Sequence, residues 1–145
     1  MFYKKGLNFD CQKCLYCCSA EPGYVFLSLE DISRLSSFFK LDKDEFLNIY
    51  TRKIDYGRYY LFSLKERSNY DCIFLTKEGC SVYEARPTQC STYPFWKNIV
   101  ESKENWDSEA LSCPGINKGR LVKKEEIENY LEKNNDNIPY MEFKK

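Results

Sequence analysis

The sequence predicts a small, partly irregular α+β domain in which short helices and a small antiparallel sheet surround a cluster of cysteines. Three observations lead to this prediction. Apolar residues recur every three to four positions in the first half of the chain, as they do in amphipathic helices. A stretch rich in Tyr and Phe then alternates every two positions, as strands do. Finally, 8 Cys are spread along the 145 residues, so the fold must bring them together.

Two short helices are predicted over residues 29–39 and 43–53, after a short buried strand at 25–27 and a turn at 21–23. Each helix begins with the spacing of a capping box, in which an N-cap side chain is followed three positions later by an acidic residue. The two pairs are Ser28 with Asp31, and Asp42 with Glu45.

The middle of the chain changes to a strand pattern. Residues 56–65 alternate in the manner of a strand, and residues 71–76 are a second strand candidate after a turn at Ser68-Asn69. A hairpin-type turn then leads directly into Cys80, and residues 80–95 are expected to be irregular or briefly helical. Residues 97–112 are polar and predict no definite element.

The last part of the chain predicts a charged helix over residues 122–134, whose apolar face is Ile127, Tyr130 and Leu131. Residues 134–145 are expected to be poorly ordered, as chain ends often are. The length predicts one domain. Residues 1–121 would form its cysteine-bearing part, and residues 122–145 would add a helix and a tail to the same domain.

The composition excludes several classes of protein. The chain has no His, so Ser-His-Asp triads, Cys-His dyads and His-containing zinc sites are excluded. Lys and Arg number 22 and Asp and Glu number 22, and this balance argues against a nucleic-acid partner. No apolar run is long enough for a transmembrane helix, and the N-terminus lacks a signal segment. We therefore expect a cytoplasmic protein without a membrane partner, with reduced thiols.

The spacing of the cysteines indicates a metal site. Two overlapping C-x-x-C units let the thiolates of Cys11, Cys14 and Cys17 bind one ion, at zinc–sulfur distances of about 2.3 Å. A fourth ligand must come from elsewhere in the chain. Cys18 must point away from Cys17, so the two serve different ions or only one binds. The count is compatible with two four-thiolate sites, with one site and spare cysteines, or with a two-metal cluster. The candidate ligands are Cys11, Cys14, Cys17, Cys18, Cys72, Cys80, Cys90 and Cys113.

Zinc is not the only metal that this pattern fits. A C-x-x-C-x-x-C run combined with a remote Cys-Pro is the ligand pattern of bacterial ferredoxins, which bind a 4Fe-4S cluster. Here the remote Cys-Pro is Cys113-Pro114, which stands much farther from the run than in ferredoxins. Cys72, in an apolar strand candidate, is also compatible with a buried thiol that binds nothing. The sequence thus predicts zinc or iron as the cofactor and leaves an iron–sulfur cluster as an alternative.

Three blocks in this order resemble the YkgJ-like cysteine-cluster family, over residues 9–115. They are Cys11-x-x-Cys14-x-x-Cys17-Cys18, then Gly79-Cys80-x-x-Tyr83-x-x-Arg86-Pro87-x-x-Cys90-x-x-Tyr93-Pro94-Phe95, and finally Cys113-Pro114-Gly115. The resemblance implies a zinc- or iron-chelating domain in a small cytoplasmic protein. The family includes the cysteine-rich part of flagellin lysine N-methylases, for which it implies an iron–sulfur cluster. Because this chain has no Gly-rich cofactor loop and little sequence after its last Cys, we do not expect methylase activity from it alone.

Arg86 is the candidate for supporting the metal from outside the ligand set. A four-thiolate zinc site is negatively charged, and a nearby guanidinium offsets that charge and donates to sulfur. Arg86 is also placed to hold an anion beside the metal. The alternative is a solvated Arg at a turn fixed by Pro87. Tyr83 and Tyr93 are expected to pack around the site.

The predicted function is therefore metal binding through thiolates, with a structural or stored metal and no catalytic residue. Two alternatives remain open. One is an iron–sulfur protein acting in electron transfer or as part of a protein-modifying, methylase-like system. The other is a metal-stapled module that docks an unknown protein partner through its aromatic surface.

Overall fold

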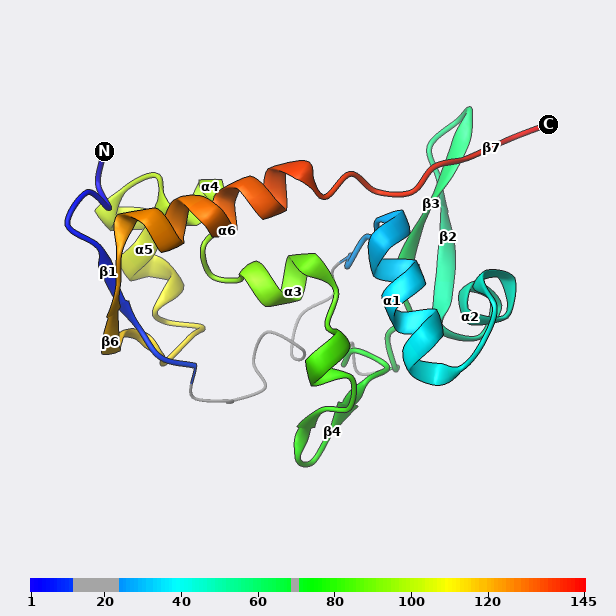
Figure 1. The fold of residues 1–145 in the computed structure, drawn as a ribbon, viewed down its shortest axis with the longest axis horizontal. Helices are drawn as coiled ribbons and strands as arrows, with labels where there is room; N and C mark the ends of the chain where they lie inside the picture. Colours follow the sequence, from blue (N-terminus) through cyan, green and yellow to red (C-terminus); the bar gives the residue numbers. More distant parts are fainter. Residues whose placement is uncertain (12–23, 69–70) are drawn as a thin grey trace. The chain divides into compact units, whose positions relative to one another are not determined.

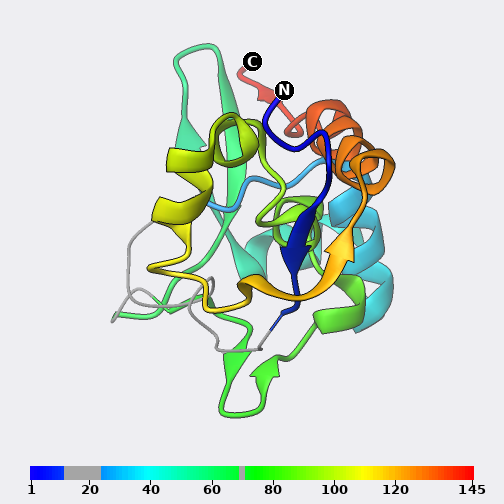
Figure 2. The same cartoon turned by 90° about the vertical axis from the view of Figure 1, so that its left-hand side faces the viewer.

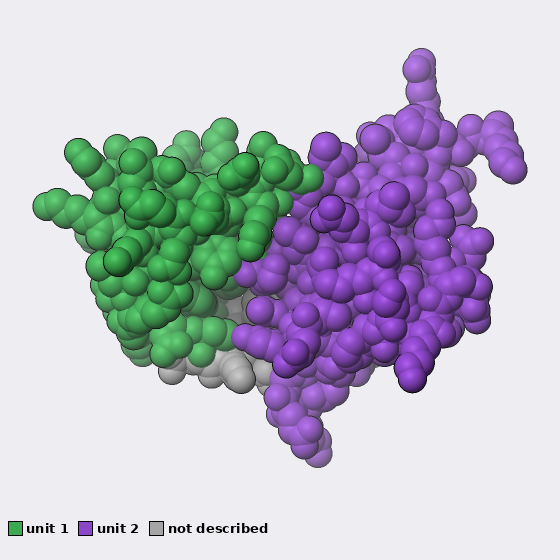
Figure 3. Space-filling model, in the orientation of Figure 1, with its two compact units in different colours: residues 1–17, 92–136 green, residues 18–91, 137–145 purple. Residues whose placement is uncertain are grey.

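The structure is a computed structural model that describes residues 1–11, 24–68 and 71–145 (Figure 1). The chain folds into short helices and small antiparallel sheets, so the predicted α+β class is confirmed. It divides into two compact units, coloured in Figure 3. Unit 1 is Met1–Cys17 with Thr92–Asp136, and unit 2 is Cys18–Ser91 with Asn137–Lys145.

Unit 2 begins with the two predicted helices, α1 (Leu29–Phe39) and α2 (Lys43–Tyr50). Both capping boxes are present, because each N-cap side chain accepts the N3 amide and each N3 side chain accepts the N-cap amide. The first helix therefore has its predicted bounds. The second ends at Tyr50 instead of continuing to residue 53, because Thr51 starts a strand.

That strand belongs to a three-stranded antiparallel sheet in the order β2-β3-β7 (Figure 1). Its strands are β2 (Thr51–Asp55), β3 (Tyr59–Leu64) and β7 (Glu142–Phe143). The tail was expected to be poorly ordered, and this expectation is wrong. The Tyr140 amide donates to the Leu27 carbonyl at 2.9 Å, and the Tyr140 ring stacks on Phe62 with centroids 5.8 Å apart.

The predicted strands around this sheet are shorter than expected. Residues 25–27 contribute only an isolated bridge between Phe26 and Ser63. In the stretch 71–76, Cys72 forms an isolated bridge with Glu66, and the hairpin strands are β4 (Leu75–Thr76) and β5 (Gly79–Cys80). The expected turns at 21–23 and at Asn69 lie outside the described residues.

Between Cys80 and Phe95, the segment predicted to be irregular contains a 3₁₀ turn, η2 (Tyr83–Ala85), and the short helix α3 (Thr88–Thr92). The core of unit 2 lies where the helices, the sheet and the β4–β5 hairpin meet. Most of its buried side chains are aliphatic, and aromatic rings pack together at its edge, where Phe39 stacks on Tyr50 at 4.6 Å and on Phe74 at 5.7 Å. Cys72 and Cys80 pack against this core.

Unit 1 contains a two-stranded ladder of β1 (Leu7–Phe9) and β6 (Ile116–Val122), seen side by side in Figure 2. The helix predicted over 122–134 is α6 (Lys124–Asp136). The polar segment that predicted no element forms α4 (Lys97–Val100) and α5 (Lys103–Glu109).

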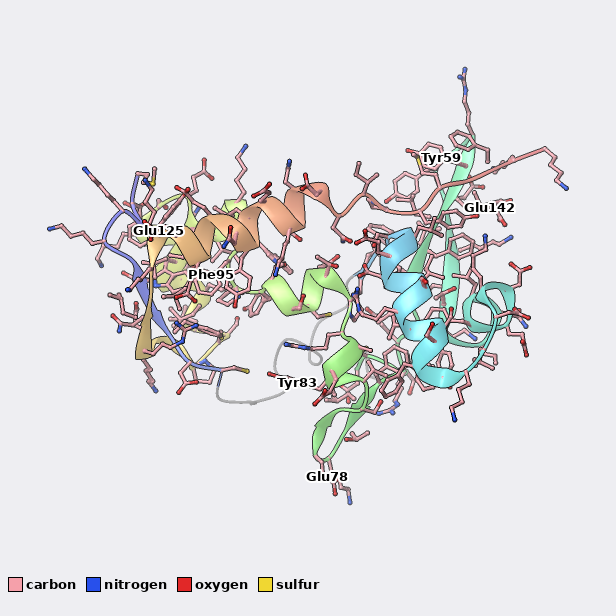
Figure 4. The ribbon with its side chains drawn as sticks, viewed as in Figure 1. Tyr59, Glu78, Tyr83, Phe95, Glu125 and Glu142 are labelled. Atoms are coloured by element: carbon pink, nitrogen blue, oxygen red, sulfur yellow. The ribbon has the colours of Figure 1, made fainter. Side chains whose placement is uncertain are left out.

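The core of unit 1 is built on Phe95, labelled in Figure 4. Its ring stacks on Tyr130 at 5.2 Å and on Trp106 at 5.7 Å. The indole N–H of Trp106 donates to Asn117 Oδ1 at 2.9 Å, so this almost fully buried ring has its polar atom satisfied. Glu125, in the first turn of α6, is exposed to solvent (Figure 4).

Candidate metal centre

Five of the eight predicted ligands fall within the described part of the chain: Cys11, Cys72, Cys80, Cys90 and Cys113. Cys14, Cys17 and Cys18 lie outside it. No disulfide joins two of the five described cysteines. Among described residues, no three side chains of the types that bind metal come together in one place. Of the described ligands, Cys11 and Cys113 belong to unit 1, and Cys72, Cys80 and Cys90 belong to unit 2.

In unit 1 the fold brings Cys11 and Cys113 to the same end of the β1–β6 ladder. Phe9 pairs with Ile116, and the Asp10 amide donates to the Gly115 carbonyl at 3.1 Å. Cys11 follows Asp10 directly, and Cys113 stands two residues before Gly115. Cys11 is exposed and Cys113 is buried. The hydrogen bond between Asp10 and Gly115 thus places two cysteines that are far apart in the sequence near one another.

Glycine is required for this close approach. A Cβ atom on Gly115 would collide with the Asp10 carbonyl oxygen, and one on Gly119 would collide with the Asp10 side chain. Both contacts would be closer than Cβ atoms tolerate, so the chain at Asp10 lies in a space that only glycine leaves open. The glycine of the Cys113-Pro114-Gly115 motif therefore has a structural role, because its lack of a side chain lets Asp10 approach just before Cys11.

In unit 2 the β4–β5 hairpin positions Cys72 and Cys80. Leu75 pairs with Cys80, and the Leu75 amide donates to the Cys72 carbonyl at 2.9 Å. Burial raises the pKa of the Cys72 thiol. A hydrogen bond from the Phe74 amide opposes that rise, whereas the neighbouring Cys80 thiol adds to it. The pairing of Leu75 with Cys80 and its bond to the Cys72 carbonyl place the two cysteines on neighbouring backbone segments. A metal cation bound there would favour both thiolates.

Cys90 lies in α3, and its amide donates to the Pro87 carbonyl at 2.9 Å. Arg86, the predicted supporting residue, precedes this turn. Its guanidinium stacks over the Tyr83 ring at 3.9 Å, and its Nε donates to the Tyr83 carbonyl at 2.9 Å (Tyr83 is labelled in Figure 4). The aromatic stacking orients the guanidinium, and its support of a metal stays a prediction.

The sequence did not reveal the residues that fasten this turn to the rest of unit 2. They are Asp31, Arg34 and Thr88. The sequence pattern predicts for Asp31 only its role in the capping box with Ser28. Its contact with Thr88 spans 57 positions, and no local pattern indicates it.

The cysteine pattern of this chain matches that of a known protein family. A family model with the description "CxxCxxCC: Putative zinc- or iron-chelating domain" matches residues 10–114. The chain belongs to the CxxCxxCC family. The predicted membership of a cysteine-cluster family is thereby confirmed, and the family description supports metal binding.

Two relatives come from Methanocaldococcus jannaschii, and both are named as uncharacterized proteins. MJ0661 is 32% identical over 103 residues, which cover 70% of this chain and 52% of the relative. MJ0939 is 26% identical over 132 residues, which cover 83% of this chain and 41% of the relative. The chain spans about half the length of these curated relatives. No solved structure matches it. Within the described residues, no helix is both long and apolar enough to cross a membrane.

Proposed function

We propose that this CxxCxxCC protein binds zinc or iron through cysteine thiolates and that the metal has a structural or storage role. The observation that carries the proposal is the family match, which begins at the cysteine run and ends at the Cys113-Pro114 motif. The placement of Cys11 with Cys113, and of Cys72 with Cys80, supports it. The proposed ligands are Cys11, Cys14, Cys17, Cys18, Cys72, Cys80, Cys90 and Cys113.

The donor set favours soft metals. Thiolates select zinc, copper(I) and iron–sulfur clusters over the hard cations that carboxylates bind. A zinc ion held by four thiolates has no open coordination position, which suits a structural role and disfavours hydrolysis at the metal. We therefore assign no catalytic residue. We also propose a reducing, cytoplasmic location, which keeps the thiolates available.

An iron–sulfur cluster is the second candidate. Its supporting observation is that Cys113-Pro114 lies at the same end of the ladder as Cys11, the first cysteine of the run. The ferredoxin pattern needs a remote Cys-Pro beside its C-x-x-C-x-x-C run. The hydrogen bond between Asp10 and Gly115 supports such an arrangement, because it places Cys113 near Cys11, where the run begins. Such a cluster would serve electron transfer or a protein-modifying system.

Metal analysis separates the two candidates. The protein is purified without oxygen, its visible spectrum is recorded, and zinc, iron and acid-labile sulfide are measured per chain. Zinc with a colourless solution would support the first proposal. Brown colour with iron and sulfide would support the second. A chain that holds neither metal, and takes up neither after reduction, would refute both.

Pairs of Cys→Ser variants test the grouping in unit 1. If Cys11 and Cys113 bind the same metal, either single change should remove it, and the double variant should lose no more than each single one. A matched comparison is Cys72→Ser, in unit 2, combined with Cys113→Ser. Additive losses in the Cys11–Cys113 pair would assign the two cysteines to different metals.

A further inference from the structure

Asp31 is a carboxylate that is completely buried, and it receives hydrogen bonds from the chain segment that precedes Cys90. Its Oδ1 atom accepts from the Thr88 amide at 2.9 Å and from the Thr88 hydroxyl at 2.8 Å. Thr88 is the first residue of α3, and Cys90 stands two positions later. One side chain on α1 therefore fixes the start of the helix that carries a proposed ligand.

Arg34 strengthens the same connection. Its Nη2 atom donates to Asp31 Oδ1 at 2.7 Å and to the Arg86 carbonyl at 2.8 Å. The backbone on both sides of Pro87 is thus bonded to α1, through Arg86 before it and Thr88 after it. After Thr88, Gln89 Nε2 donates to the Tyr24 carbonyl at 2.9 Å. This leaves little freedom for the backbone that leads into Cys90.

Capping of α1 does not explain the burial of Asp31. The capping box uses Oδ2, which accepts the Ser28 amide at 3.1 Å, and it leaves Oδ1 for the distant contacts. The box of α2 provides the comparison, because Asp42 and Glu45 complete it while exposed to solvent. A buried carboxylate is costly unless charged or polar donors compensate it. The donors to Oδ1 come from Thr88, before Cys90, and from Arg34.

We propose that Asp31 is a positioning residue of the metal centre, because its carboxylate sets the place of α3 and hence the place from which the Cys90 sulfur reaches the metal. The inference rests on the proposed function, in that it requires Cys90 to be a ligand. Outer partners of metal ligands commonly act in this way, and their loss weakens metal affinity without removing a ligand.

The primary test is Asp31→Asn in the full chain. The substitution keeps the shape of the side chain and removes its charge and one acceptor. Zinc affinity is measured by competition with a chromophoric chelator, and the cobalt(II)-loaded protein reports the thiolates bound through its charge-transfer absorption. We expect affinity to fall about 10–100-fold. Glu45→Gln, at the same position of the other capping box, is the matched control and should leave zinc affinity unchanged.

A double-mutant cycle with Cys90→Ser separates positioning from general destabilisation. If Asp31 acts through Cys90, Asp31→Asn should have no further effect on zinc affinity in the Cys90→Ser background. An equal loss in both backgrounds would overturn the proposal and leave Asp31 with a purely structural role. Thr88→Val removes only the hydroxyl bond, so it tests the same connection if Asp31→Asn does not fold. It should lower affinity by a smaller factor, and unchanged affinity in a folded Thr88→Val protein would also count against the proposal.

The same cycle distinguishes the failure of this inference from the failure of the proposed function. If Cys90→Ser leaves zinc affinity unchanged, Cys90 is not a ligand and the proposed ligand set is wrong at that position. If Cys90→Ser weakens binding while Asp31→Asn behaves like Glu45→Gln, the ligand assignment stands and the positioning role is refuted. A wild-type chain that binds neither zinc nor iron would overturn both.

Discussion

Two buried serines of α1, the N-cap Ser28 and Ser36 within the helix, differ in their hydrogen bonding. Ser28 is the N-cap, and its hydroxyl accepts the Asp31 amide at 3.1 Å. Ser36 is buried on the core side of the same helix. Within the described part of the chain, its hydroxyl has no hydrogen-bond partner. The first serine therefore stabilises the helix, whereas the second buries a polar group without compensation.

Alanine substitution should reveal this difference with opposite signs. Ser28→Ala should lower the free energy of unfolding by about 0.5–2 kcal/mol, because the cap is lost. Ser36→Ala should raise it by about 0.5 kcal/mol or more, because alanine favours the helix and leaves no unsatisfied hydroxyl. Urea unfolding followed by circular dichroism measures both. Destabilisation by Ser36→Ala would mean that its hydroxyl makes a favourable contact after all.

Gly115 offers a second test at the level of one residue. A methyl group there would collide with the Asp10 carbonyl oxygen, so Gly115→Ala should cost about 1–3 kcal/mol of stability through overpacking. It should also speed hydrogen exchange at the Asp10 amide, which donates to Gly115. The control is Gly57→Ala in the β2–β3 turn, where a Cβ meets no atom within 4 Å and the cost of alanine comes only from the positive φ of the backbone. That change should leave Asp10 exchange as it is, and equal effects of the two variants on Asp10 exchange would contradict the explanation.

Among the elements, the C-terminal segment of unit 2 departs most from expectation. β7 pairs with β3 through Tyr59 and Phe143, and Glu142 lies opposite Tyr60. Tyr59 and Glu142 are labelled in Figure 4. Lys144 forms an ion pair with Asp55 at 2.9 Å, which raises the pKa of Lys144 and lowers that of Asp55. Because both side chains are exposed, these charges add little stability. Backbone pairing and ring packing therefore hold the segment.

Two aromatic residues of this segment provide a matched pair. Tyr140→Ala should lower the free energy of unfolding by about 1–2 kcal/mol, because a partly buried ring stacked on Phe62 is lost. Phe143→Ala should change it little, because that ring is 64% exposed. Chemical unfolding compares the two variants, and an equal effect of both would show that ring packing does not anchor the segment.

The elements also show what a sequence can predict. The bounds of α1 follow from a capping box and an apolar period within its own residues, and both signals are local. Strand β2 has no such signal, because most of its side chains are exposed and it forms by pairing with β3. The helices α4 and α5 were missed because they bury few residues each, chiefly Trp106 and Ile99.

At the scale of the whole molecule, the two units have separate apolar cores. One is built around Phe46, Phe62 and Phe74, and the other around Phe95, Trp106 and Ile127. Among the described cysteines, Cys72 and Cys80 pack against the first core, and Cys113 is part of the second. Folding of the units therefore has an apolar driving force that does not depend on metal, unlike that of a classical zinc finger.

Removal of metal should accordingly weaken the protein without unfolding it. With excess chelator, the helical signal in circular dichroism should persist at room temperature while the melting temperature falls. Metal in excess should restore stability, by about 2.7 kcal/mol when its free concentration is 100 times the dissociation constant. Complete loss of helical signal on chelation would show that the apolar cores are not sufficient.

The sequence by itself determined the donor chemistry and the local elements. The cysteine run and both capping boxes consist of residues only a few positions apart. Their patterns can therefore be recognised from the spacing of residues within a short segment. Only the tertiary structure decided which distant residues meet. The hydrogen bond of Asp10 to Gly115, which places Cys11 near Cys113, and the hydrogen bonds of Thr88 to Asp31 depend on how strands pair and helices pack. The entropic cost of closing a loop rises only slowly with its length, so many long-range contacts have a similar cost. Packing and hydrogen bonding determine which of them form, and local residue spacing does not predict them.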